Sequence, residues 1–81
     1  MTPGFEPTHY NQAVAHLVEE MGEALAAAGK TLRFGPLSSN PLVPAEQREL
    51  NDAWLSRELD DVIAAIERYR TIRCFVSLRN I

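Results

Sequence analysis

The chain has a single cysteine, Cys74, so it can form no internal disulfide and has no Cys-x-x-Cys metal or redox motif. It also has no cluster of basic residues, since Lys and Arg number 8 against 11 Asp and Glu and the formal net charge is −3. Proteins that bind the nucleic-acid backbone usually carry a basic patch. No stretch approaches the roughly 18–20 apolar residues that cross a bilayer, and residues 1–8 lack the pattern of a signal peptide. We therefore expect a cytoplasmic protein that binds neither nucleic acid nor membrane.

The length of 81 residues allows one domain and limits the core that the chain can build by itself. Domains of this size bury only about 60% of the surface that the unfolded chain exposes. The hydrophobic content of 46% and the charged content of 23% are ordinary for a folded protein. We therefore expect a single domain over residues 1–81 that associates into a homodimer or homotetramer.

Two segments have the pattern of long amphipathic helices. Residues 9–28 contain no proline, and Gly29 stands where a C-terminal cap is expected. Apolar residues recur in this segment at spacings of three and four, at Val14, Leu17, Val18, Met21, Leu25 and Ala28. A second apolar stripe is formed by Leu55, Leu59, Val62, Ile66 and Tyr69. It predicts a second helix from about Ala45 to Arg70.

The segments outside the helices differ in composition. Residues 1–8 contain two prolines and a glycine and form an expected irregular lead-in, and the glycine- and proline-rich residues 29–45 are predicted to be a long loop. Loops longer than about 12–15 residues are uncommon in compact domains and are often functional. Residues 71–81 suit a continued helix or a short separate element, and we favour helix. The predicted fold is all-α, with two long antiparallel helices, a short C-terminal element and a four-helix bundle completed by dimerisation.

Two acidic pairs are the most informative feature of the sequence. Glu20 and Glu23 are three residues apart, as are Glu58 and Asp61, so each pair occupies one face of its helix. At about 100° per residue both pairs border the apolar stripes, where packing of the helices would bring them together. Carboxylates from two helices are suitable ligands for Mg²⁺. The alternative is that they are solvated surface charges, but two such pairs with few basic neighbours favour a metal site.

Other side chains suit a nucleotide-like ligand but also have simpler interpretations. Lys30, Arg33 and Phe34 lie in the predicted loop, where two cations and an aromatic ring could bind phosphates and a flat base. The alternative is that the loop cations are merely solvated. Trp54 could stack on a base, although core packing is the simpler role. His16 stands one turn before Glu20, and we expect it to pack rather than to bind metal.

The runs Glu19-Glu20-Met-Gly-Glu23 and Glu58-Leu-Asp-Asp61 resemble the Glu-Glu-x-x-Glu and Glu-x-x-Asp motifs of the MazG-like, all-α nucleoside triphosphate pyrophosphohydrolases. The resemblance implies that the four residues of the two acidic pairs hold Mg²⁺, with Mn²⁺ as a substitute, against a triphosphate. Attack by water would then release pyrophosphate and a nucleoside monophosphate. It also implies a catalytic role for Glu19 and Glu20 in orienting or activating that water.

The resemblance covers roughly residues 14–70, and the spacer between the motifs is longer than in compact members of the superfamily. The function that it predicts is Mg²⁺-dependent hydrolysis of a (d)NTP. A non-catalytic helical oligomerisation or regulatory module that keeps the scaffold is the alternative. A plain metal-binding bundle is a third interpretation, although such bundles usually carry Glu-x-x-His ligands, which this chain lacks.

Overall fold

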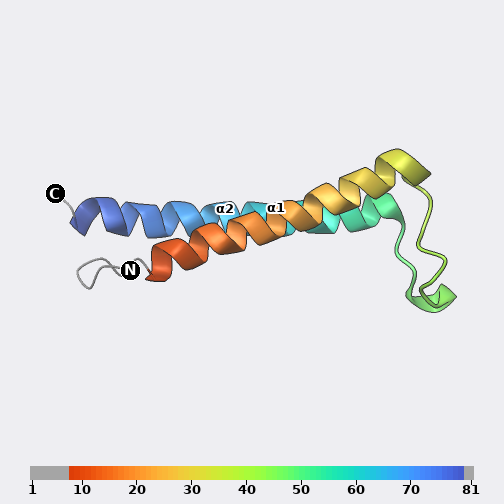
Figure 1. The fold of residues 1–81 in the computed structure, drawn as a ribbon, viewed down its shortest axis with the longest axis horizontal. Coiled ribbons are helices and arrows are strands. Elements are labelled where there is room, and N and C mark those ends of the chain that lie inside the picture. Colours follow the sequence, from red (N-terminus) through yellow and green to blue (C-terminus); the bar gives the residue numbers. More distant parts are fainter. Residues whose placement is uncertain (1–7, 80–81) are drawn as a thin grey trace.

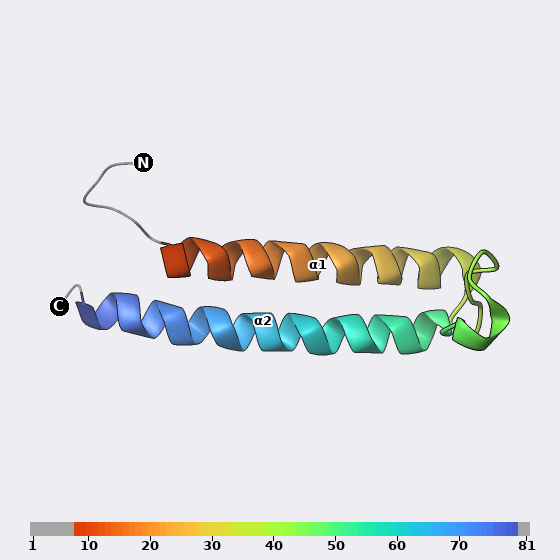
Figure 2. The ribbon, with the colours of Figure 1, turned by 90° about the horizontal axis from the view of Figure 1, so that it is seen from below.

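The computed structural model describes the backbone of residues 8–79 and the side chains of residues 9–74. The chain forms a helical hairpin in which α1 (Thr8–Phe34) and α2 (Asn51–Arg79) pack antiparallel (Figures 1 and 2). The described residues contain no strand, so the prediction of an all-α fold with two long antiparallel helices is confirmed. The molecule measures 52 × 22 × 21 Å, and its long axis runs along the two helices (Figure 1). In the part of the chain that is described, no helix is long and apolar enough to cross a membrane.

α1 ends later than the sequence predicted. It continues through Gly29 to Phe34, so the loop predicted for residues 29–45 begins too early. The glycine that ends the helix is Gly35, whose φ of 96° is a left-handed conformation that other residues rarely adopt. The Gly35 N–H donates to the carbonyl of Thr31 at 2.9 Å and closes the last turn.

α2 begins later than predicted, at Asn51 rather than near Ala45. Residues Ala45–Gln47 form a separate 3₁₀ turn, η1. The extended backbone of Arg48, with φ −71° and ψ 134°, interrupts the helical path between η1 and α2. The connection between the two long helices therefore spans residues 35–50.

Asn51 ties this connection to the end of α1. The residue is buried, its backbone N–H donates to the carbonyl of Ser38 at 2.8 Å, and its side-chain Nδ2 donates to the carbonyl of Gly35 at 3.1 Å. The next residue, Asp52, donates its N–H to the carbonyl of Pro36 at 2.9 Å. These bonds satisfy backbone groups at the start of α2 and hold the connection against both helices.

The outer ends of the helices lie at the other end of the hairpin. α1 begins at Thr8, which the sequence placed in the irregular lead-in, and the other residues of that lead-in, 1–7, lie outside the described part of the chain. Residues 71–79 continue α2, as favoured from the sequence, and form no separate element. Residues 80 and 81 lie outside the described part.

The interface between α1 and α2 contains small and polar side chains. Among the side chains that the structure describes, its buried apolar residues are alanines, namely Ala13, Ala24, Ala27 and Ala65. No large side chain among the described residues is fully buried. Burial of apolar area contributes about 25 cal/mol per Å², so alanines contribute little each. The single hairpin therefore has a weak hydrophobic core.

Several residues of the apolar stripe of α1 face away from α2. Val18, Met21 and Leu25 are 65%, 48% and 73% exposed, and Leu32, further along the same side, is 89% exposed. Leu59 of α2 is also 47% exposed. The reason is that α1 packs through its alanine face, which is rotated from the stripe of larger residues. Apolar surface thus remains uncovered on the outside of the hairpin.

Candidate metal site

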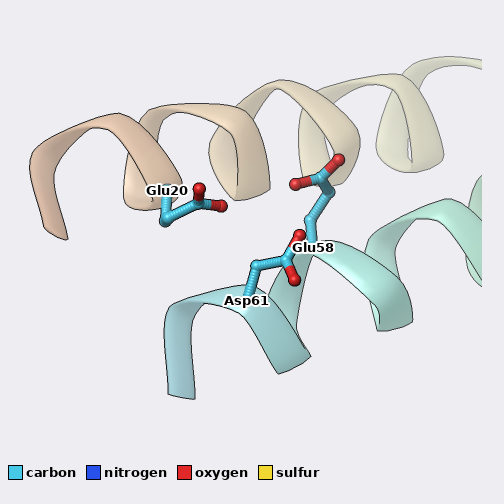
Figure 3. A group of neighbouring side chains, drawn as sticks. All are labelled: Glu20, Glu58 and Asp61. Atoms are coloured by element: carbon cyan, nitrogen blue, oxygen red, sulfur yellow. The ribbon is translucent and has the colours of Figure 1, made fainter. Parts of the chain in front are cut away.

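Three carboxylates meet between the helices: those of Glu20 on α1 and of Glu58 and Asp61 on α2 (Figure 3). One oxygen of each lies within 4.8 Å of the other two. The spacing of three residues places the two α2 side chains on one face, and the antiparallel packing places Glu20 opposite them. The structure therefore brings together three of the four metal ligands predicted from the sequence, and we call them the carboxylate group.

Glu58 is the most buried member of the carboxylate group, at 5% exposure. Its Oε1 accepts a hydrogen bond of 3.1 Å from the indole Nε1 of Trp54 and lies 3.3 Å from Nη1 of Arg57. Both partners lie on α2, Trp54 one helical turn before Glu58 and Arg57 directly before it. They fix the orientation of the carboxylate.

Two oxygens of the carboxylate group are buried without a hydrogen-bond partner among the described residues: Oε2 of Glu20 and Oε2 of Glu58. Leaving a buried polar atom unpaired costs about 1–3 kcal/mol, and more for a charged group. Native proteins rarely leave such atoms without a partner. A cation between the two helices would provide a partner for both oxygens.

The donor set of the carboxylate group fits a hard divalent cation. Mg²⁺ binds oxygen ligands at about 2.0–2.1 Å and usually keeps several waters, so two of its ligands lie at most about 4.2 Å apart. Oxygens separated by up to 4.8 Å need only small side-chain rotations to reach one ion. Asp61 is exposed and leaves one side of the site open to a ligand.

Glu23, the fourth predicted ligand, lies at the edge of the site. It is exposed and is not among the three carboxylates that share the 4.8 Å distance. Repulsion from the Glu20 carboxylate raises the pKa of Glu23 above its usual value, with further contributions from desolvation and from the nearby Glu58 carboxylate. Glu23 therefore interacts electrostatically with both Glu20 and Glu58 and belongs to the same electrostatic cluster.

The two remaining α1 candidates lie beside the site. Nε2 of His16 is 3.5 Å from Oε1 of Glu20, and its Nδ1 is buried without a partner among the described residues. His16 thus contacts one carboxylate rather than the whole group. Glu19, a predicted catalytic residue, is exposed, stands outside the carboxylate group and contributes least to the raised pKa of Glu23.

A pocket of about 550 Å³ adjoins the carboxylate group, at the end of the hairpin that holds the connection. Three predicted substrate-binding residues, Lys30, Phe34 and Trp54, line it. The fourth, Arg33, is not a lining residue, and its guanidinium lies 5.8 Å from the centre of the Phe34 ring. Lys30 and Phe34 belong to the last turns of α1 rather than to a loop.

Sequence reasoning missed Arg57, which lines the pocket and contacts Glu58. Trp54 shares both properties, so these two residues connect the pocket to Glu58, although no member of the carboxylate group lines the pocket itself. The position of Arg57 directly before Glu58 was visible in the sequence. Its bonds to Glu49, from Nη2 at 3.1 Å and Nε at 3.3 Å, were not, because they depend on the path of the connection.

Comparisons with family models, with curated proteins and with solved structures give no match to this chain.

Proposed function

We propose that this chain is a Mg²⁺-dependent nucleoside triphosphate pyrophosphohydrolase of the MazG-like type, which converts a (d)NTP to a (d)NMP and pyrophosphate. The observation that carries the proposal is the unpaired Oε2 of the buried Glu58 inside a group of three carboxylates. A glutamate that only stabilised the fold would be expected to have both oxygens paired at this depth. The two sequence motifs support the nucleotide chemistry in particular.

Each residue of the site has a distinct part in this proposal. Glu20 contributes a ligand from α1, Glu58 and Asp61 contribute ligands from α2, and Glu23 adds negative charge at the edge. When bound, Mg²⁺ supplies charge neutralisation and Lewis-acid polarisation of the triphosphate. Because both helices contribute ligands, the site depends on the packing of the hairpin.

Of the two candidates for accepting a proton from the attacking water, Glu20 is better placed than Glu19. The carboxylate of Glu20 belongs to the group, whereas Glu19 is exposed and outside it. A general base must be within hydrogen-bond reach of the proton that it removes, directly or through one water. We therefore assign this step to Glu20.

The pocket is the proposed site for the nucleoside. Its volume of about 550 Å³ falls within the roughly 300–1,000 Å³ of small-molecule sites. Phe34 and Trp54 offer aromatic surface to a base, and Lys30, whose Nζ lies 5.4 Å from the centre of the Phe34 ring, offers a positive charge. Trp54 and Arg57, which line the pocket and contact Glu58, would place the triphosphate towards the proposed metal ligands.

We also propose that two hairpins associate into a four-helix bundle, as a homodimer or as half of a homotetramer. The exposed stripe of α1, formed by Val18, Met21, Leu25 and Leu32, is the surface that a second copy would cover. Leu59 and Ile63, which is 53% exposed, extend apolar surface onto α2. A hairpin whose buried apolar side chains, among those described, are all alanines would gain stability from this additional burial.

The direct test is incubation with Mg²⁺ and a panel of NTPs, dNTPs and (p)ppGpp, followed by chromatography of the products. Wild-type protein should release pyrophosphate and a monophosphate from at least one nucleotide, and Glu58→Gln should not. Asp60→Asn is the matched control, because Asp60 is exposed and outside the carboxylate group. Release of inorganic phosphate alone, or full activity of Glu58→Gln, would contradict the proposal. Metal binding without turnover of any nucleotide would favour the non-catalytic module.

A further inference from the structure

Arg57 connects the pocket to the carboxylate group. Its side chain lines the pocket, and its Nη1 lies 3.3 Å from Oε1 of Glu58. The side chain is 55% exposed, so a ligand in the pocket can reach it. Phosphates held at the carboxylate group through Mg²⁺ would lie beside this guanidinium.

The rest of the Arg57 guanidinium is paired with Glu49, in the connection between the helices. Nη2 donates to Oε1 of Glu49 at 3.1 Å, and Nε donates to Oε2 at 3.3 Å. Two parallel N–H bonds to two oxygens are the geometry with which arginine also binds phosphate. Glu49 therefore occupies the position that two phosphate oxygens could take.

The other two cations that line the pocket have different partners. Nε and Nη2 of Arg48 donate to the carbonyls of Val43 at 2.7 Å and of Pro41 at 3.0 Å, which braces the connection. The ammonium of Lys30 lies over the ring of Phe34. Among the lining residues, Arg57 is thus the cation whose guanidinium faces both the pocket and a metal ligand.

The pair between Arg57 and Glu49 is suited to exchange. Both side chains are partly exposed, at 55% and 39%, and exposed ion pairs contribute little to folding. Glu49 is also the single carboxylate among the pocket-lining residues, against three cations. A polyphosphate that enters this pocket would compete with one carboxylate for a guanidinium that already has the required orientation.

We propose that Arg57 is a phosphate-binding residue and that Glu49 is an internal competitor, which the polyphosphate of the ligand displaces. This inference rests on the proposed function, because it takes the ligand to be a metal-bound polyphosphate. Displacement frees Glu49 and releases one link between the connection and α2. Glu49 thereby lowers affinity for anions that cannot replace both of its bonds and favours polyphosphates over single small anions.

The test is calorimetric titration of Mg²⁺-tripolyphosphate into wild type, Glu49→Gln, Arg57→Gln, Arg57→Lys and the double variant Glu49→Gln/Arg57→Gln, at fixed ionic strength. Glu46→Gln is the matched control. It removes the same charge from the same connection, and Glu46 forms no ion pair among the described residues. Thermal melts confirm that each variant is folded, and Mn²⁺ titration by electron paramagnetic resonance reports the metal site independently.

We expect Glu49→Gln to bind tripolyphosphate roughly two- to fivefold more tightly than wild type, because an exposed competitor of ordinary strength is gone. Arg57→Gln should weaken tripolyphosphate binding roughly tenfold or more. Arg57→Lys should have an affinity between those of wild type and Arg57→Gln, because lysine keeps the charge but cannot form two parallel N–H bonds. The double variant should bind like Arg57→Gln alone. Saturable Mn²⁺ binding should remain in all of them, unchanged in Glu49→Gln and weaker in the Arg57 variants, which lose a contact to Glu58.

Three results would overturn the exchange: Glu49→Gln binding no tighter than Glu46→Gln, Glu49→Gln tightening binding equally in the Arg57→Gln background, or Arg57→Gln binding as well as wild type. Each of these leaves the metal site and the hydrolysis assay untouched. Failure of the proposed function has a different signature, namely wild-type protein that binds Mn²⁺ and tripolyphosphate but cleaves no nucleotide. Wild-type protein that binds neither would overturn both proposals.

Discussion

The indole Nε1 of Trp54 donates a hydrogen bond of 3.1 Å to Oε1 of Glu58, one helical turn further along α2. This bond engages one oxygen of the carboxylate, while the other, Oε2, remains buried and unpaired. Trp54 also lines the pocket. One side chain therefore orients Glu58 of the carboxylate group and forms part of the wall of the pocket.

Replacing Trp54 with Phe should keep an aromatic ring in the pocket wall and remove the donor to Glu58. Hydrogen bonds to charged groups contribute roughly 1.5–3 kcal/mol, and partial exposure reduces this, so we expect a loss of about 1 kcal/mol in the free energy of unfolding. Affinity for Mn²⁺ should fall roughly tenfold, because residues that orient metal ligands typically have effects of this size. Urea denaturation and Mn²⁺ titration measure the two effects. Unchanged metal affinity would show that the bond does not orient Glu58.

Glu23→Gln should stabilise the metal-free protein at neutral pH. The pKa of Glu23 is raised above its usual value of 4.5 in the folded protein, chiefly by the Glu20 carboxylate, so the folded state holds this proton more tightly than the unfolded state. The resulting stability is complete below the unfolded-state pKa and is lost as the pH rises through the folded-state pKa. Wild type and variant should therefore be nearly equal in stability in acid, diverge between the unfolded-state and the folded-state pKa, and keep the full difference above the folded-state pKa.

Urea denaturation in EDTA across the acid to neutral range measures this divergence. Glu19→Gln is the control, because Glu19 is exposed and is the weakest contributor to the raised pKa of Glu23. Mg²⁺ should reverse the order of stability, since the ion interacts with the ionised carboxylate that the variant lacks. A Glu23→Gln variant that is less stable than wild type at neutral pH without metal would contradict the electrostatic cluster.

Leu25→Lys should prevent association of two hairpins. Leu25 is 73% exposed in the single chain and lies in the stripe proposed to contact a second copy, where a lysine would be buried without a partner. Light scattering should show an oligomer for wild type at micromolar concentration and a monomer of lower stability for the variant. Leu42→Lys is the control, because Leu42 is 91% exposed in the connection, outside the stripe. A stable wild-type monomer would contradict the bundle.

The two glycines at the end of α1 should respond to alanine in opposite directions. Gly29→Ala should stabilise the protein by about 0.5–1 kcal/mol, since Gly29 is inside the helix and a Cβ there meets nothing within 4 Å. Gly35→Ala should destabilise it by about 1–2 kcal/mol, because φ is 96°. Denaturation of both variants measures the difference. A Gly35→Ala variant more stable than Gly29→Ala would show that α1 ends elsewhere.

The helices and the acidic pairs were predictable because both depend on periodicity within one segment. Spacings of three and four identify the faces of α1 and α2, and the same spacing places Glu58 and Asp61 together. Antiparallel packing of two helices joined by a connection then brings Glu20 towards them. The structure has this arrangement for three of the four predicted ligands.

The ends and contacts that were not predicted depend on tertiary structure. Gly29 and Gly35 both suit a cap in the sequence, and the structure places the positive φ at Gly35, which precedes Pro36 and whose carbonyl accepts a hydrogen bond from Nδ2 of Asn51. Likewise, the periodicity of α1 does not show which of its faces packs against α2. The structure packs the alanine face there and leaves much of the stripe of larger apolar residues exposed. The ion pair between Glu49 and Arg57 joins the connection to α2. Helical periodicity does not extend into the connection, so it could not predict this pair.

The central claim is that Glu20, Glu58 and Asp61 bind a divalent cation, and Mn²⁺ titration followed by electron paramagnetic resonance tests it most directly. Free Mn²⁺ gives a sharp six-line spectrum that is lost on binding. We expect saturable binding to the wild-type protein that Mg²⁺ competes away, loss of that binding in Glu58→Gln, and its retention in Asp60→Asn. Equal binding by wild type and Glu58→Gln, or no saturable binding by wild type, would contradict the claim.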